Sequence, residues 1–362
     1  MLRNLATGAE ERLTDVLAFA FDDSAKVLAY TVVSRDSTKD GAFLRAMTGG
    51  TTTTLLAGRL SIRQPAGHFV LEQQLFNALS LGCVYALFAL GFTLVFGVLG
   101  VINLSHGSVF MLGAYAALEC ITRLHAPLWA AIVFAFLFSG LVGLAIDRAV
   151  LKPLRARDAP HLIPMIATIG LGLSMNSLVQ GVFGAENQRF PSEVLPDQAI
   201  VVAGVSVTVL ELGIILVSFV LMSVLLFALK KTQLGRALRA IAESPKAARL
   251  LGINVEGLFM VTSAVAAGLG GISGVLIGLY SNALFPIMGQ PIMHKGIAVI
   301  ILGGMGDIRG AMFAGLFLGF AEVLSVAYIG STMRDAVAFG LLFLVLLVRP
   351  KGLFGSVQER KV

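Results

Sequence analysis

The amino-acid sequence predicts an all-α fold, a polytopic bundle of about eight or nine membrane-crossing helices. Of the 362 residues, 57% are hydrophobic and only 13% carry a charge, whereas a soluble domain has roughly 25% charged residues. Glycine is frequent, with 40 residues, and small residues let membrane helices approach closely. From about residue 70 onward, apolar runs recur, most of them near the length of about 20 residues that a membrane helix needs.

The apolar runs follow one another with few interruptions. Eight of them are full or nearly full spans: Phe76–Val98, Val109–Ile121, Leu128–Ile146, Leu162–Phe183, Val205–Leu229, Leu258–Leu279, Ala311–Ile329 and Ala336–Val348. A further run, Ile292–Gly304, is short and ends in glycines, so it either crosses the membrane or re-enters it.

Clusters of Lys and Arg predict which loops face the cytoplasm. Such clusters lie within residues 148–157, 230–249 and 349–361, whereas the loop 184–203 is acidic and is expected on the other side. Both the second and the third cluster are expected on the cytoplasmic side of the membrane, so an even number of crossings must lie between them. Four runs lie there if 292–304 is counted. We therefore expect 292–304 to cross as a half-length helix buried among its neighbours, and the C-terminus to be cytoplasmic.

Residues 1–69 differ in amino-acid composition from the rest of the chain. They contain many charged residues and a low-complexity run at Gly49–Thr54, and they lack the pattern of a secretory signal peptide. We expect a weakly structured extension or a region upstream of the natural start, and assign it no function. The membrane domain is expected over 70–355, followed by a tail at 356–362.

Charge and cysteine content argue against other kinds of protein. The formal net charge of +6 is typical of basic cytoplasmic loops, and the basic residues do not form the clustered surface that nucleic-acid binding needs. Cys83 and Cys120 lie inside apolar runs, so we expect neither a disulfide framework nor a metal site.

The loop 230–257 is the most informative soluble segment. A helical pattern begins at Gly235 and is broken before Pro245, which fits the first turn of a second helix with Ser244 as its N-cap. Gly252 is expected to end that helix. Its apolar face is exposed unless a partner covers it, and consists of Ala247, Ala248, Leu250 and Leu251. The pattern fits either a helix on the lipid surface or a docking element for a cytoplasmic partner.

Polar residues interrupt the apolar sequence at Asn103, Ser105 and His106. Polar groups at membrane depth usually face the bundle interior or a water-filled route. These three side chains therefore either line a translocation path or satisfy backbone groups at a helix break, and we favour the helix break.

Glu322 lies in the middle of an apolar run. An unpaired carboxylate in lipid is costly, so this side chain must face protein. We expect a structural glutamate that holds its helix to its neighbours, with contact to a substrate amino group as the alternative. The sequence offers it no convincing charged partner. His294 and Lys295 precede the short run and are expected to cap its interface with water.

Four blocks of sequence carry a resemblance to a known family. They are Leu75–Ala117, Gly235–Val255, Ile301–Ser325 and Leu341–Gly355. In order and spacing they resemble the permeases of branched-chain amino acid ABC importers, of the LivH type, over about four-fifths of the chain. Residues 1–69 depart from the family pattern, in which the first span lies close to the start.

The resemblance implies a bacterial inner-membrane importer of several parts. These would be a second, LivM-like permease subunit, two cytoplasmic ATPases and a periplasmic substrate-binding protein. ATP would be used by the partner subunits, because this chain has no phosphate-binding loop of the G-x-x-x-x-G-K-[ST] type. The chain itself is therefore expected to be neither an enzyme nor a cofactor-binding protein.

The resemblance also implies that the loop 235–252 seats on an ATPase and couples ATP use to transport. The residues assigned to this coupling are Gly235, Arg236, Arg239, Ala240, Glu243, Ala247, Ala248, Leu251 and Gly252.

Three functions remain open at the level of the sequence. The first is import of leucine, isoleucine and valine or related amino acids, and the second is import of urea, amides or another small solute by the same kind of permease. The third is a secondary transporter that works alone, which would be expected to show paired charges in the membrane. A signalling protein would need a sizeable soluble output domain, and the sequence predicts none.

Overall fold

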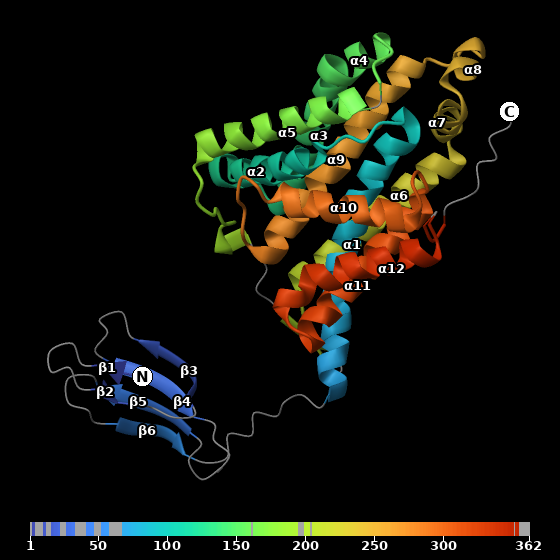
Figure 1. The fold of residues 1–362 in the computed structure, drawn as a ribbon. Coiled ribbons are helices and arrows are strands. Elements are labelled where there is room, and N and C mark those ends of the chain that lie inside the picture. Colours follow the sequence, from blue (N-terminus) through green and yellow to red (C-terminus); the bar gives the residue numbers. More distant parts are fainter. Residues whose placement is uncertain are drawn as a thin grey trace. The chain divides into compact units, whose positions relative to one another are not determined.

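The computed structural model divides into two compact units, Met1–Val70 and Leu71–Val362 (Figure 1). It describes the following residues: 2–3, 10–11, 16–21, 27–32, 41–46, 52–57, 67–160, 162–194, 199–202, 205–350 and 352–354. The expected tail, 356–362, lies outside them.

The N-terminal unit contains short antiparallel strands. They are β1 Leu2–Arg3, β2 Glu10–Glu11, β3 Val16–Phe21, β4 Val27–Val32, β5 Gly41–Ala46 and β6 Thr52–Ala57. Strands β3 to β6 form a four-stranded meander in chain order, and β1 pairs with β2. The residues of β4 and β6 are rich in Val, Thr and aromatic or aliphatic types that favour strands. Regular strands were not expected in this region. The expectation that residues 1–69 lie outside the working protein stays a prediction.

The second unit is built from helices. The longer ones are α1 Gly67–Leu99, α2 His106–Leu124, α3 Leu128–Ile146, α5 Leu162–Phe183, α6 Val209–Lys231, α9 Val255–Ser281, α10 Gly289–Gly303, α11 Ile308–Tyr328 and α12 Arg334–Val348. Shorter helices are α4 Lys152–Ala156, α7 Gln233–Glu243 and α8 Pro245–Leu250, and a hairpin is formed by β7 Ala199–Val202 and β8 Val205–Thr208.

Seven helices among the described residues are long and apolar enough to cross a membrane. Helices α2 and α10 are not among them, since α10 has 15 residues and α2 begins with polar residues. Both are nevertheless largely buried in the bundle. The expected fold class, a membrane helical bundle, is confirmed, and the expected count of eight or nine is approximate.

The core of the bundle lies around α1 and α9. In the most apolar stretch of α1, 89% of the residues are buried, compared with 6% in α12. Helix α9 packs against α2 and α3 through glycines: a Cβ at Gly274 would lie 1.9 Å from the carbonyl oxygen of Phe110, and one at Gly271 would clash with Ser139. The glycines of α9 are thus required by close helix contact.

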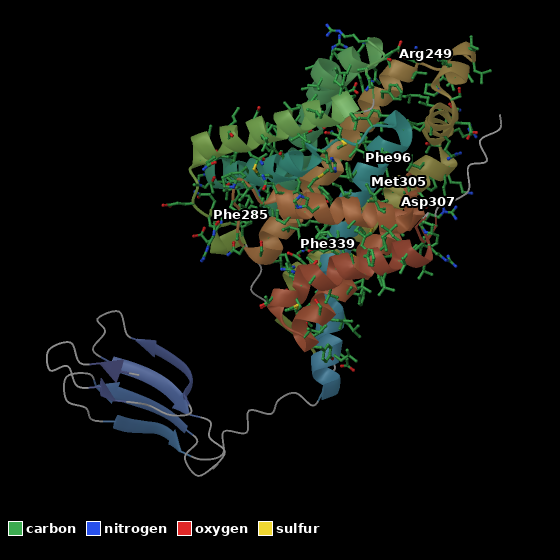
Figure 2. The ribbon with its side chains drawn as sticks, in the orientation of Figure 1. Phe96, Arg249, Phe285, Met305, Asp307 and Phe339 are labelled. Carbon is green, nitrogen blue, oxygen red and sulfur yellow. The ribbon has the colours of Figure 1, made fainter. Side chains whose placement is uncertain are left out.

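The first two basic clusters gather at one end of the bundle, whereas most of the third, including Lys351 and Arg360, lies outside the described residues. Figure 1 shows α4, α7 and α8 at this end. Glu256, at the start of α9, lies 3.7 Å from Arg155 of the first cluster and 3.1 Å from Arg249 of the second. After α12, the Leu353 amide donates to the carbonyl of Leu302 at the end of α10. Figure 2 shows Arg249 at this end and Phe285 at the opposite one.

One helix begins later than the apolar pattern indicated. The run Val205–Leu229 was expected to be helical throughout, but its first four residues form β8 and α6 begins at Val209. Thr208 and Glu211 form a reciprocal capping box, in which each side chain bonds the other residue's backbone N–H. The capping box fixes the start of α6. The backbone groups of β8, just before it, are satisfied by pairing with β7.

Candidate functional site

Helices α7 and α8 form the expected helix–turn–helix at the basic end of the bundle. Thr232 caps α7 by accepting from the Gly235 amide at 3.2 Å, and Ser244 caps α8 by accepting from the Ala247 amide at 3.3 Å. Pro245 occupies the first turn of α8, where its missing N–H costs nothing. Gly252 follows with a φ of +80°, a conformation that favours glycine.

The two helices are anchored on one side and exposed on the other. Leu238, Ile241 and Ala248 are buried, whereas Leu250 and Leu251 are 89% and 78% exposed. The expectation that Ala248 belongs to the exposed face is therefore wrong: in the short helix α8 it points inward, and the chain after α8 folds back on it, with the Ile253 amide donating to its carbonyl.

The remaining predicted coupling residues divide in the same way. Gly235 allows α7 to approach α6, because a Cβ there would lie 2.1 Å from the Leu229 carbonyl oxygen. Arg239 donates to the same carbonyl. Arg236, Glu243 and Ala247 are exposed, and Ala240 is half-buried. We call the exposed side of α8, formed by Leu250 and Leu251, the docking face.

Charged residues tie this element to the bundle. Arg155 donates to Asp147 at 2.8 Å, lies 3.7 Å from Glu256 and stacks over the Phe259 ring at 4.6 Å. Because Arg249 in α8 also pairs with Glu256, the docking element, the first basic cluster and α9 share one network. Sequence reasoning used Arg155 and Arg249 only as topology signals and missed the network.

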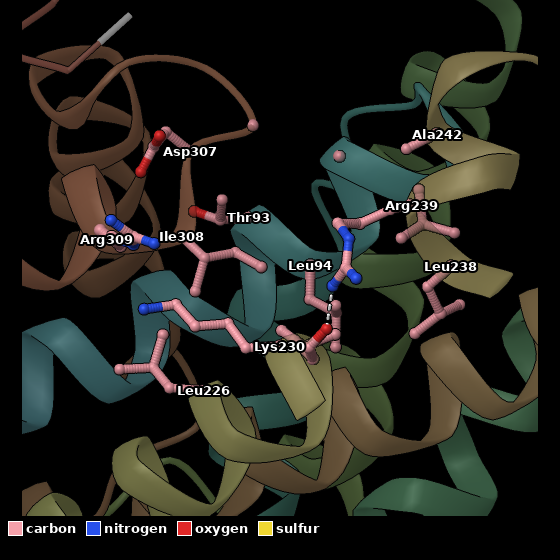
Figure 3. A pocket seen from close by; sticks show the side chains of 14 residues that line it. Thr93, Leu94, Leu226, Lys230, Leu238, Arg239, Ala242, Asp307, Ile308 and Arg309 are labelled. Carbon is pink, nitrogen blue, oxygen red and sulfur yellow. Dashed lines mark hydrogen bonds between the residues drawn. The ribbon is translucent and has the colours of Figure 1, made fainter. Parts of the chain in front are cut away.

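A pocket of about 270 Å³ opens between α7, the ends of α1 and α6, and the start of α11 (Figure 3). Arg239 lies on one side, while Asp307 and Arg309 lie on the other, and Lys230 extends between them. Asp307 caps α11 by accepting from the Gly310 amide at 2.7 Å. The pocket therefore separates the docking element from the start of α11.

The polar residues before α2 form a compact helix break. The Asn103 side-chain oxygen accepts from the Ser105 amide at 3.1 Å and the Ser105 hydroxyl at 2.6 Å. His106 lies against the rings of Phe88 and Phe92, at centroid distances of 4.8 and 5.7 Å. All three polar residues are buried, and their contacts support the helix-break interpretation; a place for them in a translocation path stays a prediction.

Glu322 is not alone, as the sequence suggested, but belongs to a buried ion cluster. Its Oε1 lies 2.7 Å from Lys295 Nζ and contacts Arg334 Nε, and Lys295 also donates to the Tyr85 hydroxyl at 3.2 Å. Asp335 lies 3.5 Å from Lys295 Nζ. Lys295 therefore does not cap an interface with water. The pairing joins four helices, and a linear pattern gives no sign of which helices meet.

A second pocket, of about 400 Å³, lies where α2 and α10 begin beside α5. Its polar lining includes Asn176, Gln290 and His294, and its apolar lining includes Ile169 and Leu173. We call it the central pocket. Sequence reasoning did not select Asn176 or Gln290. The only signal in the sequence was that two helices begin with polar residues and glycine, and this signal is too weak to assign a site.

The chain matches a model of the family described as branched-chain amino acid transport system, permease component, over residues 74–346. It is 36% identical to the high-affinity branched-chain amino acid transport system permease protein LivH of Salmonella typhimurium, and 36% identical to the corresponding protein BraD of Pseudomonas aeruginosa. Each alignment covers 80% of this chain and 97% of the relative. The protein LivM of Escherichia coli K12 is 25% identical, over 81% of this chain and 72% of its own. No solved structure matches.

Proposed function

The chain belongs to the family of permease components of branched-chain amino acid transport systems, and we propose that it is the membrane-spanning subunit of an ATP-driven importer that depends on a binding protein. Its substrates would be leucine, isoleucine and valine or related amino acids. Family membership favours this function over a secondary transporter. The buried ion cluster around Glu322 joins helices of one subunit and lines neither of the two pockets described above.

The observation that carries the coupling role is the docking face. Leu250 and Leu251 are large apolar side chains that point away from the bundle on a capped, anchored helix. Exposed apolar residues of this kind suit burial against a protein partner. We propose that a cytoplasmic ATPase covers them and pushes on α8 when it closes over ATP.

The route of such a push follows contacts within the chain. Glu256 links Arg249 of the docking element to the start of α9. Further along α9, Gly270 and Gly274 pack against His106 and Phe110 at the beginning of α2. Rigid elements packed in this way can carry a displacement between distant sites, so movement of α8 would be transmitted to the centre of the bundle.

The proposed assembly contains a second, LivM-like permease subunit, two ATPases and a periplasmic binding protein. A LivM protein is itself similar to this chain, which is consistent with two related permeases side by side. The ATPases would bind at the basic end, where the docking face lies, so that this end and the C-terminus are cytoplasmic and the membrane is the bacterial inner membrane. ATP would be hydrolysed on the partners.

Uptake in a deletion strain tests the function. Cells that lack this gene should lose uptake of labelled leucine at low concentration and regain it with the gene on a plasmid, while urea uptake stays unchanged. Loss of urea uptake with normal leucine uptake would assign the permease to another solute. Vesicles that contain this chain alone and accumulate leucine under an ion gradient would instead identify a secondary transporter.

A further inference from the structure

The central pocket lies at mid-depth along the bundle, not at either end, and it opens on an outer face, where Ile169 and Leu173 are 41% and 56% exposed. Immediately before it, His106 contacts Gly91 and Gly270, which lie well inside α1 and α9. The α2 backbone then crosses the start of α10, where a Cβ at Gly289 would lie 1.9 Å from the Gly107 carbonyl oxygen. Helix α10, with 15 residues, is about 22 Å long, too short for a hydrocarbon core of about 30 Å. Both helices therefore begin at membrane depth.

The polar side chains of the pocket lack partners within the part of the chain that the structure describes. The side chains of Asn176, Gln290 and His294 make no hydrogen bond or ion pair there, although each lines the pocket. Polar groups at membrane depth that are not paired face a water-filled cavity or another protein, because lipid cannot satisfy them. This face of α5 and α10 is thus suited to a hydrated route or to a second subunit, and not to lipid.

The helix starts add a preference for negative charge. Neither α2 nor α10 has a side-chain cap. The His106 and Gln290 amides donate to the carbonyls of Asn103 and Ile287 in the preceding turns, and the dipole of each helix favours negative charge at its start. In some transporters, interrupted membrane helices meet with their N-termini at mid-depth. The positive ends of the helix dipoles can then hold a carboxylate without a charged side chain. Here two such helix starts border one pocket that is large enough for a small solute.

The remaining wall of the pocket is apolar. Ile169 and Leu173 on α5 and Met293 on α10 face the same space as the polar groups. This combination complements an amino acid with an aliphatic side chain: amides accept from its ammonium group, helix starts receive its carboxylate, and the apolar wall covers its side chain.

We propose that the central pocket is the solute site of this permease, with Gln290 and Asn176 holding the α-amino-acid group and Ile169 and Leu173 packing against the aliphatic side chain. This inference rests on the proposed function and deepens it by naming the residues. Among the described residues, the lining of the pocket contains no Asp, Glu, Lys or Arg. The solute is therefore not held by a fixed charge, which suits a transport site from which it must also leave.

Two variants test the two halves of the site in cells that carry the complete importer. Ile169→Trp fills the apolar wall, so maximal uptake of leucine should fall more than that of valine, and the leucine-to-valine ratio should drop about tenfold, the discrimination that one methylene can give. Gln290→Leu removes a contact to the group that both solutes share, so both uptake rates should fall while the ratio stays constant.

Both control variants lie on α5. Ile166→Trp adds the same bulk to α5 outside the pocket, since Ile166 is exposed and does not line it, and Gln180→Leu removes an exposed amide of α5 that also lies outside it. Both should match the parent in rate and ratio. If Ile169→Trp does not reach the membrane, as judged by immunoblot, Leu173→Phe replaces it.

The outcomes separate the site from the function. A parent importer that takes up neither leucine nor valine contradicts the proposed function itself. With a parent that imports both, an unchanged leucine-to-valine ratio in Ile169→Trp overturns the pocket assignment, whether the rates are normal or equally reduced. A ratio that falls equally in Ile166→Trp overturns it too.

Discussion

Lys295 and Glu322 form a buried ion pair of 2.7 Å, from Nζ to Oε1, that joins α10 to α11. Arg334 from the start of α12 contacts the same carboxylate, and Tyr85 of α1 bonds to the same ammonium group. Three consecutive helices and the distant α1 thus meet at one cluster of charges. A short helix such as α10 gains from this cluster a fixed position in the bundle.

Replacement of Glu322 by Gln should destabilise the helical unit. The change removes the buried carboxylate that Lys295 and Arg334 share and leaves Lys295 only the exposed Asp335 at 3.5 Å; loss of one partner of a buried pair costs about 3–5 kcal/mol. Thermal unfolding of the purified chain in detergent measures the effect. The double variant Lys295→Met, Glu322→Met removes both charges and should recover much of the loss. A single variant as stable as the parent would show that the pair does not hold α10.

Gly289→Ala should disturb the crossing of α2 and α10. The added Cβ would lie 1.9 Å from the Gly107 carbonyl oxygen, so the two backbones must separate, at a cost of about 1–3 kcal/mol or more. Gly181→Ala is the control, because a Cβ at Gly181 meets no atom within 4 Å. The amount of each protein in the membrane and its unfolding temperature provide the comparison, and equal behaviour of the two variants would contradict the close crossing.

Leu251→Glu should separate ATP use from transport. Leu251 is exposed on the docking face, so the variant should insert normally but lose leucine uptake and substrate-stimulated ATPase activity of the complex. Ala248→Glu should instead reduce the amount of folded protein, because Ala248 is buried. Leu124→Glu places the same charge on an exposed leucine at the end of α2, away from α8, and should retain activity. Normal uptake in the Leu251 variant would contradict the docking role.

Arg155→Lys should weaken the network beneath the docking element. The guanidinium of Arg155 reaches both Asp147 and Glu256, and a lysine ammonium cannot reproduce that fork. The loss of one hydrogen bond between charged groups is worth about 1.5–3 kcal/mol and should lower the unfolding temperature. Arg148→Lys is the control, since Arg148 makes no ion pair among the described residues. A drop of the same size in both variants would contradict a specific role for Arg155.

Local signals in the sequence predicted the helices well. The bounds of α3 and α5 agree with the apolar runs, and the Ser244, Pro245 and Gly252 signals gave the start and end of α8. Each of these features depends on residues close together in the chain: a run of apolar side chains, a capping hydroxyl, or a glycine with positive φ.

Features made by tertiary contact could not be predicted in this way. The partners of Glu322 come from two other helices, with Tyr85 of α1 joined through Lys295, and the central pocket combines α2, α5 and α10. The inward direction of Ala248 depends on how the chain packs after α8. Apolar periodicity shows that a helix has an apolar surface but not which neighbour covers it, so these contacts had to come from the structure.

The most direct test of the central claim is leucine accumulation in proteoliposomes. The vesicles would contain this chain, the LivM-like subunit and both ATPases, with ATP inside and the binding protein outside. We predict that labelled leucine accumulates only when ATP and this chain are both present, and that Leu251→Glu abolishes accumulation. Equal accumulation without ATP, or from vesicles that lack this chain, would contradict its assignment as the permease of an ATP-driven importer.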